Sequence, residues 1–72
     1  MLHIGSQKYV ERTKVTFVGD YEESLKEGRQ VINICREGQE PKTMIITSDG
    51  MVFITFLSAW SIARRMGGKD NE

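Results

Sequence analysis

The chain has very few of the residues from which active sites and covalent cross-links are built: its 72 residues include one cysteine, one histidine and one proline. A single cysteine excludes an internal disulfide framework and fits a reducing compartment. Cys35 follows Ile34, and we expect it to be a small buried hydrophobic group. A single histidine, His3, excludes histidine clusters that bind metals. The glycines form neither a dinucleotide-binding nor a P-loop pattern. We therefore predict a protein that is not an enzyme and has no cofactor, metal or small-molecule substrate.

Long apolar segments are also missing. The longest uncharged run, residues 50–63, has 14 residues, whereas a membrane helix needs about 20. The N-terminus, MLHIGSQKYVER, lacks the basic and then apolar pattern of a signal peptide. The sequence contains neither internal repeats nor linkers rich in proline or serine. We therefore expect one cytoplasmic domain, residues 1–72, that does not interact with membranes.

The sequence does contain several segments rich in β-branched and aromatic residues, which favour strands. We predict strands at residues 1–4, 8–18, 30–35, 43–47 and 51–56. The sequence SDG between the last two predicts a hairpin turn in which Gly50 takes a positive φ. With the two helices described next, the fold class is α+β, a small and largely antiparallel sheet with one short central helix and a C-terminal helix.

Capping signals predict where the two helices lie. The first has one or two turns within residues 19–28, where Asp20 caps it, Glu23 lies at the capping-box spacing and Gly28 closes it. The second runs over residues 59–66 after the cap residue Ser58. Its apolar residues follow the spacing of a buried stripe, and they are Ala59, Ile62, Ala63 and Met66. We expect residues 67–72 to form a disordered tail.

The strand predicted at residues 51–56, MVFITF, is almost continuously apolar. Because side chains alternate along a strand, Val52 and Ile54 lie on one face and Met51 and Phe53 on the other. The terminal helix can cover only one face, and soluble monomers rarely expose large apolar patches. We therefore predict a homo-oligomer. The alternative is a monomer whose sheet curls over its own second face.

The charge balance, ten basic and ten acidic residues, argues against a protein that coats nucleic acid through net charge. Basic residues nevertheless gather in two segments, so local contact with nucleic acid stays open. These residues are Lys8, Arg12 and Lys14 in the first segment and Arg64, Arg65 and Lys69 in the second. The only tryptophan, Trp60, is predicted to pack in the core or between subunits, or to act as a stacking platform.

The order of these signals resembles the bacterial extracellular-matrix regulator family, the small RemA/RemB proteins. The resemblance spans residues 2–66 and rests on LHIG near the N-terminus, a valine-bearing strand, PKTMIIT, an apolar strand and SAWSIARR. Pro41-Lys42 and the final Arg64-Arg65 are more similar to the RemB branch. The resemblance implies a non-enzymatic transcription regulator of biofilm-matrix genes that forms ring-like oligomers and binds double-stranded DNA.

The residues that bind DNA in the family carry over only in part. The basic residue that the RemA branch has before its second strand falls on Lys14, whereas its paired loop arginines fall on Gln39 and Glu40. This loop therefore lacks the charge that phosphate contacts need. The expected DNA-binding residues are Lys14, Lys42, Arg64, Arg65 and Arg12. Two functions stay open, an oligomeric DNA-binding regulator and an oligomeric protein-interaction module without DNA binding.

Overall fold

The computed structural model describes residues 1–67. The elements follow in the order β1 (Leu2–Gly5), β2 (Lys8–Val10), the 3₁₀ turn η1 (Arg12–Lys14), β3 (Val15–Asp20), the 3₁₀ turn η2 (Glu23–Lys26), β4 (Gln30–Asn33), β5 (Thr43–Thr47), β6 (Met51–Thr55) and α1 (Ala59–Met66). The predicted α+β class is confirmed. Of the tail expected to be disordered, Gly67 follows α1 as its C-cap residue, and residues 68–72 lie outside the described part of the chain.

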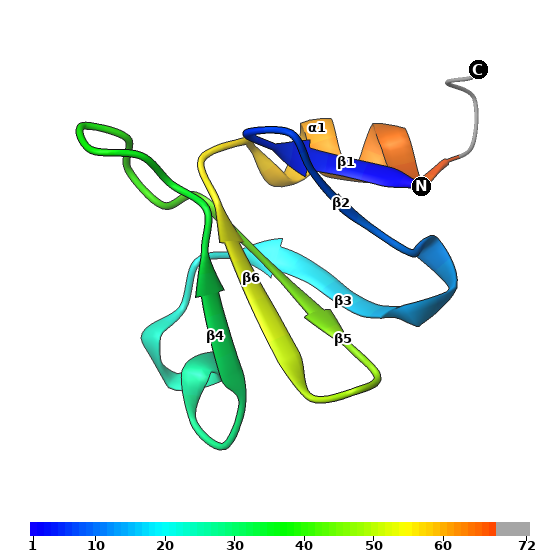
Figure 1. Ribbon diagram of the computed structural model, residues 1–72, viewed down its shortest axis with the longest axis horizontal. Coiled ribbons are helices and arrows are strands. Elements are labelled where there is room, and N and C mark those ends of the chain that lie inside the picture. The colour runs from blue at the N-terminus through cyan, green and yellow to red at the C-terminus, as the bar shows by residue number, and fades with distance from the viewer. Residues whose placement is uncertain (68–72) are drawn as a thin grey trace.

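Four strands form the central sheet in the order β3-β5-β6-β4 (Figure 1). The β3–β5 and β5–β6 pairs are antiparallel, while β4 runs parallel to β6. β1 and β2 form a separate antiparallel ribbon. The hairpin between β5 and β6 turns at Gly50, whose φ of 84° confirms the predicted left-handed glycine. The extended segment predicted at residues 8–18 is divided in two, because η1 turns the chain between β2 and β3.

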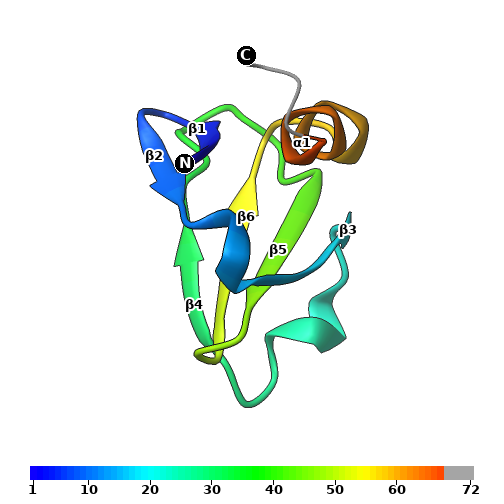
Figure 2. The same ribbon diagram turned by 90° about the vertical axis from the view of Figure 1, so that its right-hand side faces the viewer.

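One face of the sheet lies under the β1–β2 ribbon and α1 (Figure 2). Ile45 and Phe53 are direct partners across β5 and β6, so their side chains share this face. Leu2, Ile4 and Ile62 pack against it and are fully buried. The predicted cap of α1 is confirmed, since the Ser58 hydroxyl accepts a hydrogen bond from the Ser61 amide at 3.2 Å.

The second face carries Met44, Ile46, Val52 and Ile54, and here our reason for expecting an oligomer is wrong. All four side chains are buried within a single chain, Val52 completely. Their cover is the connection between β3 and β4, from which Tyr21 and Leu25 pack onto the face, together with Cys35. The apolar strand β6 therefore has two covered faces without a neighbouring molecule, and the cover of the second is the β3–β4 connection, not the curled sheet of our alternative.

The short central helix also differs from the prediction. Asp20 ends β3, and η2 begins after Glu22, whose side chain makes no capping bond. Glu23 instead accepts a hydrogen bond from the Tyr21 hydroxyl at 2.7 Å and pairs with Lys26 at 3.0 Å. The closing glycine is confirmed, because Gly28 has a φ of 74°. Pairing of β3 with β5 as far as Asp20 removes the residue that was to cap the helix, and only a 3₁₀ turn remains.

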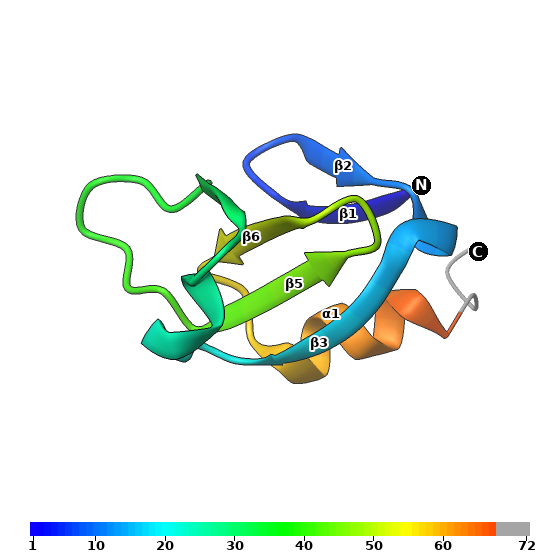
Figure 3. The ribbon, with the colours of Figure 1, turned by 90° about the horizontal axis from the view of Figure 1, so that it is seen from below.

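Within α1, the predicted apolar stripe is only partly buried. Ile62 is fully buried, and Ala59 and Met66 are half-buried, but Ala63 is exposed. α1 contacts β1 and β3 and runs beside β3 (Figure 3). Ala63 and Met66 lie at this border with β3. An exposed apolar strip therefore follows one edge of the sheet.

Candidate nucleic-acid interface

Lys14, the residue that the resemblance places at the DNA contact, lies in η1 immediately before β3. Its backbone carbonyl accepts a hydrogen bond from the Ser48 amide at 2.8 Å, which fixes η1 against the β5–β6 turn. Its ammonium lies 3.7 Å from a carboxylate oxygen of Glu11 and 3.9 Å from one of Asp49. About half of the Lys14 side chain is exposed. A phosphate that binds Lys14 therefore has to compete with two neighbouring carboxylates.

Asp49 is held in position by the turn to which it belongs. The Thr47 hydroxyl donates a hydrogen bond to the Asp49 carboxylate. This bond is the main cause that lowers the pKa of Asp49, with a smaller contribution from the charge of Lys14. Asp49 is therefore anionic at neutral pH, and the β5–β6 turn carries a fixed negative charge beside Lys14.

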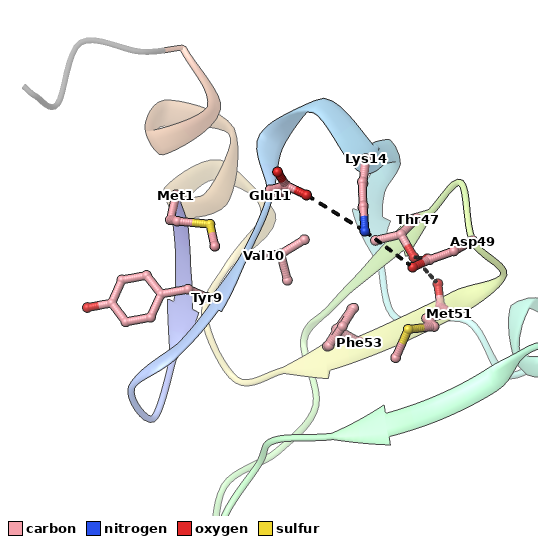
Figure 4. A pocket seen from close by; sticks show the side chains of 9 residues that line it. All are labelled: Met1, Tyr9, Val10, Glu11, Lys14, Thr47, Asp49, Met51 and Phe53. Carbon is pink, nitrogen blue, oxygen red and sulfur yellow. Dashed lines mark hydrogen bonds and ion pairs between the residues drawn. The ribbon is translucent and has the colours of Figure 1, made fainter.

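A cavity of about 170 Å³ opens next to Lys14. Figure 4 shows the Lys14 ammonium between the two carboxylates at its rim, with Val10 and Phe53 between the ribbon and the sheet. The lining residues are Met1, Tyr9, Val10, Glu11, Lys14, Thr47, Asp49, Met51 and Phe53. Apart from its rim the lining is mostly apolar, so the cavity lacks the converging donors that a phosphate-binding pocket needs.

The two arginines at the end of α1 have different surroundings. Arg65 donates from one guanidinium nitrogen to the His3 carbonyl at 2.9 Å, and the same nitrogen lies 3.3 Å from His3 Nδ1. This contact joins the last turn of α1 to β1. Arg64 lies over the ring of Trp60, at 4.8 Å from the ring centroid, and both side chains are exposed. Arg64 is therefore accessible to a ligand, whereas Arg65 is engaged within the fold.

Lys42 lies apart from the other expected residues. It precedes β5, and Lys14 lies beside the turn that follows β5, so the two lysines are at opposite ends of this strand. The loop before Lys42 is folded on itself, since the Gln39 side chain accepts a hydrogen bond from the Arg36 amide at 2.7 Å. Glu40 is exposed in this loop. The loop that carries arginines in the RemA branch is thus remote from Lys14 within one chain.

Four of the five expected residues lie toward one end of the molecule, although their side chains contact different partners. α1 runs antiparallel to β3 (Figure 3). Met66 of its last turn and Val15, which follows η1, line one groove, so the end of α1 and η1 lie toward the same end of the molecule (Figure 1). Among residues 1–67, this end carries Arg12, Lys14, Arg64 and Arg65, together with the acidic residues Glu11 and Asp49. Residues 20–42 contain four basic and six acidic residues and lie mostly toward the other end of Figure 1. The charges of residues 1–67 are therefore unevenly distributed between the two ends.

The partners of these basic residues, Glu11, Asp49 and His3, were not expected from the sequence. Glu11 precedes Lys14 by three residues, a spacing that by itself indicates a local ion pair in a turn. No local pattern indicates the other two partners, because Asp49 and His3 are distant from Lys14 and Arg65 in the sequence.

Within residues 1–67, no group of three or more histidine, cysteine, aspartate or glutamate side chains is arranged to hold a metal ion. None of the helices in that part of the chain is sufficiently long and apolar to cross a membrane. The chain matches no model of a known protein family and no curated protein.

Proposed function

We propose that the chain is a cytoplasmic, non-enzymatic transcription regulator that binds double-stranded DNA as a ring-like homo-oligomer, as the resembling biofilm-matrix regulators do. The observation that supports this function is that the start of β3, next to η1, and the last turn of α1 line one groove, so basic residues from distant parts of the sequence lie toward the same end of the molecule. Lys14 and Arg64 are the exposed members of this group, and they are the side chains that we assign to phosphate contacts.

Binding by one chain is weak in this proposal, because Glu11 and Asp49 already hold the Lys14 ammonium. Assembly compensates for this weakness, since several weak contacts on one particle act at a high effective concentration. Because the second sheet face is covered within one chain, it gives no reason for self-association. Self-association is supported instead by large apolar side chains that are exposed. They are Met1, Tyr9, Phe17, Val31 and Trp60, between 42% and 74% exposed.

The proposed function is tested by titrating duplex DNA with the protein at several salt concentrations. Each lost phosphate contact lowers the slope of log affinity against log salt by about 0.9. Lys14→Ala and Arg64→Ala should each flatten the slope and weaken binding to many sequences alike, because phosphate contacts carry little base information. Asp49→Asn should strengthen binding by removing a competitor of the DNA. Glu37→Gln, the same change of charge in the remote loop, is the matched control.

A second comparison decides which end of the folded molecule faces the DNA, the one with Lys14 and Arg64 or the one with the loop that carries Glu40. Glu40→Lys restores a positive charge in the loop where the RemA branch has arginines, and it should have less effect than Asp49→Asn if the basic end binds. If neither the unmodified protein nor the Asp49→Asn variant binds duplex DNA at low salt, the proposed function is wrong.

The second candidate function is a protein-interaction module without DNA binding. The exposed Trp60, 68% accessible on the outer side of α1, favours it, because tryptophan is enriched at protein interfaces. An oligomer that ignores DNA in both titrations would support this function instead.

A further inference from the structure

Trp60 and Arg64 form an exposed pair on the outer side of α1. The indole ring of Trp60 is 68% exposed, although a ring of this size is normally covered. The Arg64 guanidinium lies 4.8 Å from the ring centroid, four residues later and on the same side of the helix. Tryptophan and arginine are two of the residue types that contribute most to protein interfaces. α1 therefore presents an aromatic ring and a cation together, and we call them the Trp60–Arg64 pair.

The cavity beside Lys14 has the size and lining that fit an aromatic ring. Its volume is about 170 Å³, and an apolar cavity of about 150 Å³ holds a benzene ring. Val10 and Phe53 lie at its centre, between the β1–β2 ribbon and the sheet (Figure 4). Met1 and Met51 also line it, and methionine sulfur atoms make favourable contacts with aromatic rings. The cavity can therefore accept one aromatic side chain.

The rim of this cavity has an excess of negative charge. Two carboxylates, of Glu11 and Asp49, lie beside the single ammonium of Lys14 (Figure 4). The two acidic side chains are 55% and 47% exposed, so both have oxygen atoms that can accept further hydrogen bonds. Hydrogen bonds from arginine to a carboxylate are charge-assisted and strong. The site therefore fits an aromatic ring that has a cation next to it.

We propose that the Trp60 ring of one copy of this chain inserts into the cavity of the next copy, where Arg64 pairs with Glu11 and Asp49. Within one chain Trp60 is exposed and does not line the cavity, so the contact is one between copies. A second copy is the occupant that the chain's own surface supplies. The contact involves three of the five large apolar side chains that are exposed among residues 1–67, Trp60 itself and Met1 and Tyr9 at the cavity.

The two surfaces that meet are different, because the Trp60–Arg64 pair belongs to α1 and the cavity lies between the β1–β2 ribbon and the sheet. Each copy in such a head-to-tail contact keeps a free pair or a free cavity for a further copy. Contacts of this kind are repeated until a ring closes. The proposed contact is therefore compatible with the ring-like oligomer of the proposed function.

The contact also completes the phosphate site of the proposed function, on which this inference rests. In one chain the Lys14 ammonium faces two carboxylates. In the assembly, Arg64 of the neighbouring copy adds a second positive charge and balances them. Lys14 and Arg64 then lie side by side although they come from different copies. DNA binding should therefore require the assembly.

The first test uses the unmodified protein and needs no substitution. Trp60 is the only tryptophan, so its fluorescence reports on this contact alone. As the protein concentration rises, the emission should shift to shorter wavelengths and quenching by acrylamide should fall, with the same midpoint as the mass measured by sedimentation. An oligomer in which Trp60 is quenched as strongly as in the monomer would overturn the inference.

The second test mixes two variants that each lack one side of the contact. Trp60→Ala keeps the cavity, and Glu11→Lys keeps the Trp60–Arg64 pair but reverses a charge at the rim. Both replaced side chains are exposed, so both variants should fold. Alone, Trp60→Ala should associate roughly 30-fold more weakly, the size of effect typical of a central interface residue, and Glu11→Lys roughly 10-fold more weakly.

An equal mixture of the two variants should form a complex of one copy of each and grow no further, because it contains one intact pair and one intact cavity. A mixture that associates no better than the separate variants would overturn the inference. Val31→Ala, at another exposed apolar residue, and Glu40→Lys, the same charge reversal in the remote loop, are the matched controls. Both should leave association unchanged.

The outcomes separate this contact from the proposed function. A protein that is monomeric at all concentrations would overturn both, and a protein that stops at two copies would overturn the head-to-tail arrangement. If Trp60→Ala associates and binds DNA as the unmodified protein does, the contact is wrong and the proposed function stands. If Trp60 becomes buried in an oligomer that ignores duplex DNA, the contact stands and the proposed function is wrong.

Discussion

Val52→Ala tests whether the chain itself, and not a neighbouring copy, buries the second face of the sheet. Val52 is completely buried, in a cluster with Met44, Ile46 and Ile54 under Tyr21 and Leu25. The substitution removes two methyl groups, each worth about 0.8 kcal/mol of burial, and leaves a small cavity. We expect the free energy of unfolding to fall by about 2 to 3 kcal/mol. At roughly 4 to 8 °C per kcal/mol for a domain of this size, Tm should fall by at least about 8 °C.

The matched control is Val31→Ala. Val31 is the direct partner of Val52 in the β4–β6 register but is 42% exposed, so its truncation should cost less than about 1 kcal/mol. Thermal and urea unfolding should be followed by far-ultraviolet circular dichroism, because the only tryptophan, Trp60, is 68% exposed and reports poorly on the core.

Protein concentration decides between the two ways of burying this face. If the chain buries Val52 itself, the difference between Val52→Ala and the unmodified protein stays the same over a wide range of concentration. If the loss in Val52→Ala appears only at concentrations where the protein associates, or is no larger than in Val31→Ala, our description of the second face is wrong. A charged residue at Val52 should accordingly unfold the chain instead of dissociating an oligomer.

Three further predictions concern local structure. Gly5→Ala should destabilise the protein more than Gly38→Ala, measured by urea unfolding: both glycines have positive φ, but a Cβ at Gly5 would lie 3.0 Å from Phe56 Cε1, whereas Gly38 is surrounded by open space. Ser58→Ala should lower the free energy of unfolding by about 1 kcal/mol, because it removes the cap of α1. If the variant is as stable as the unmodified protein in urea unfolding, Ser58 does not stabilise the helix. Thr47→Val should raise the pKa of Asp49, followed by NMR titration, since it removes the bond that mainly lowers this pKa. A lowered carboxyl pKa stabilises the folded state above the unfolded value of about 3.9, and this contribution is lost as pH falls through the folded value.

Where the controlling contacts are close in sequence, the chain by itself determined the structure. The residues 59–66 predicted for the terminal helix are those of α1, and its Ser58 cap bonds an amide only three residues away. The same holds for the turn at Gly50 and the glycine at position 28, because a positive φ is a property of single residues. The β-rich composition likewise indicated four of the six strands with small errors at their ends.

Only the tertiary structure decided what covers the second face of the sheet and which partners the basic residues have. Tyr21 and Leu25 reach Met44 and Val52 through contacts between distant parts of the chain. The sequence of residues 19–28 predicts a short helix, but it does not indicate which face of the sheet this segment covers. Asp20 does not cap a helix, because it pairs with Thr43 of β5, which is also distant in the sequence. Likewise, Arg65 meets His3 across 62 residues, so its charge is engaged within the fold although the sequence pattern indicated a free basic end. Local patterns record interactions within about one helical turn, while long-range packing decides which charges and apolar faces remain exposed.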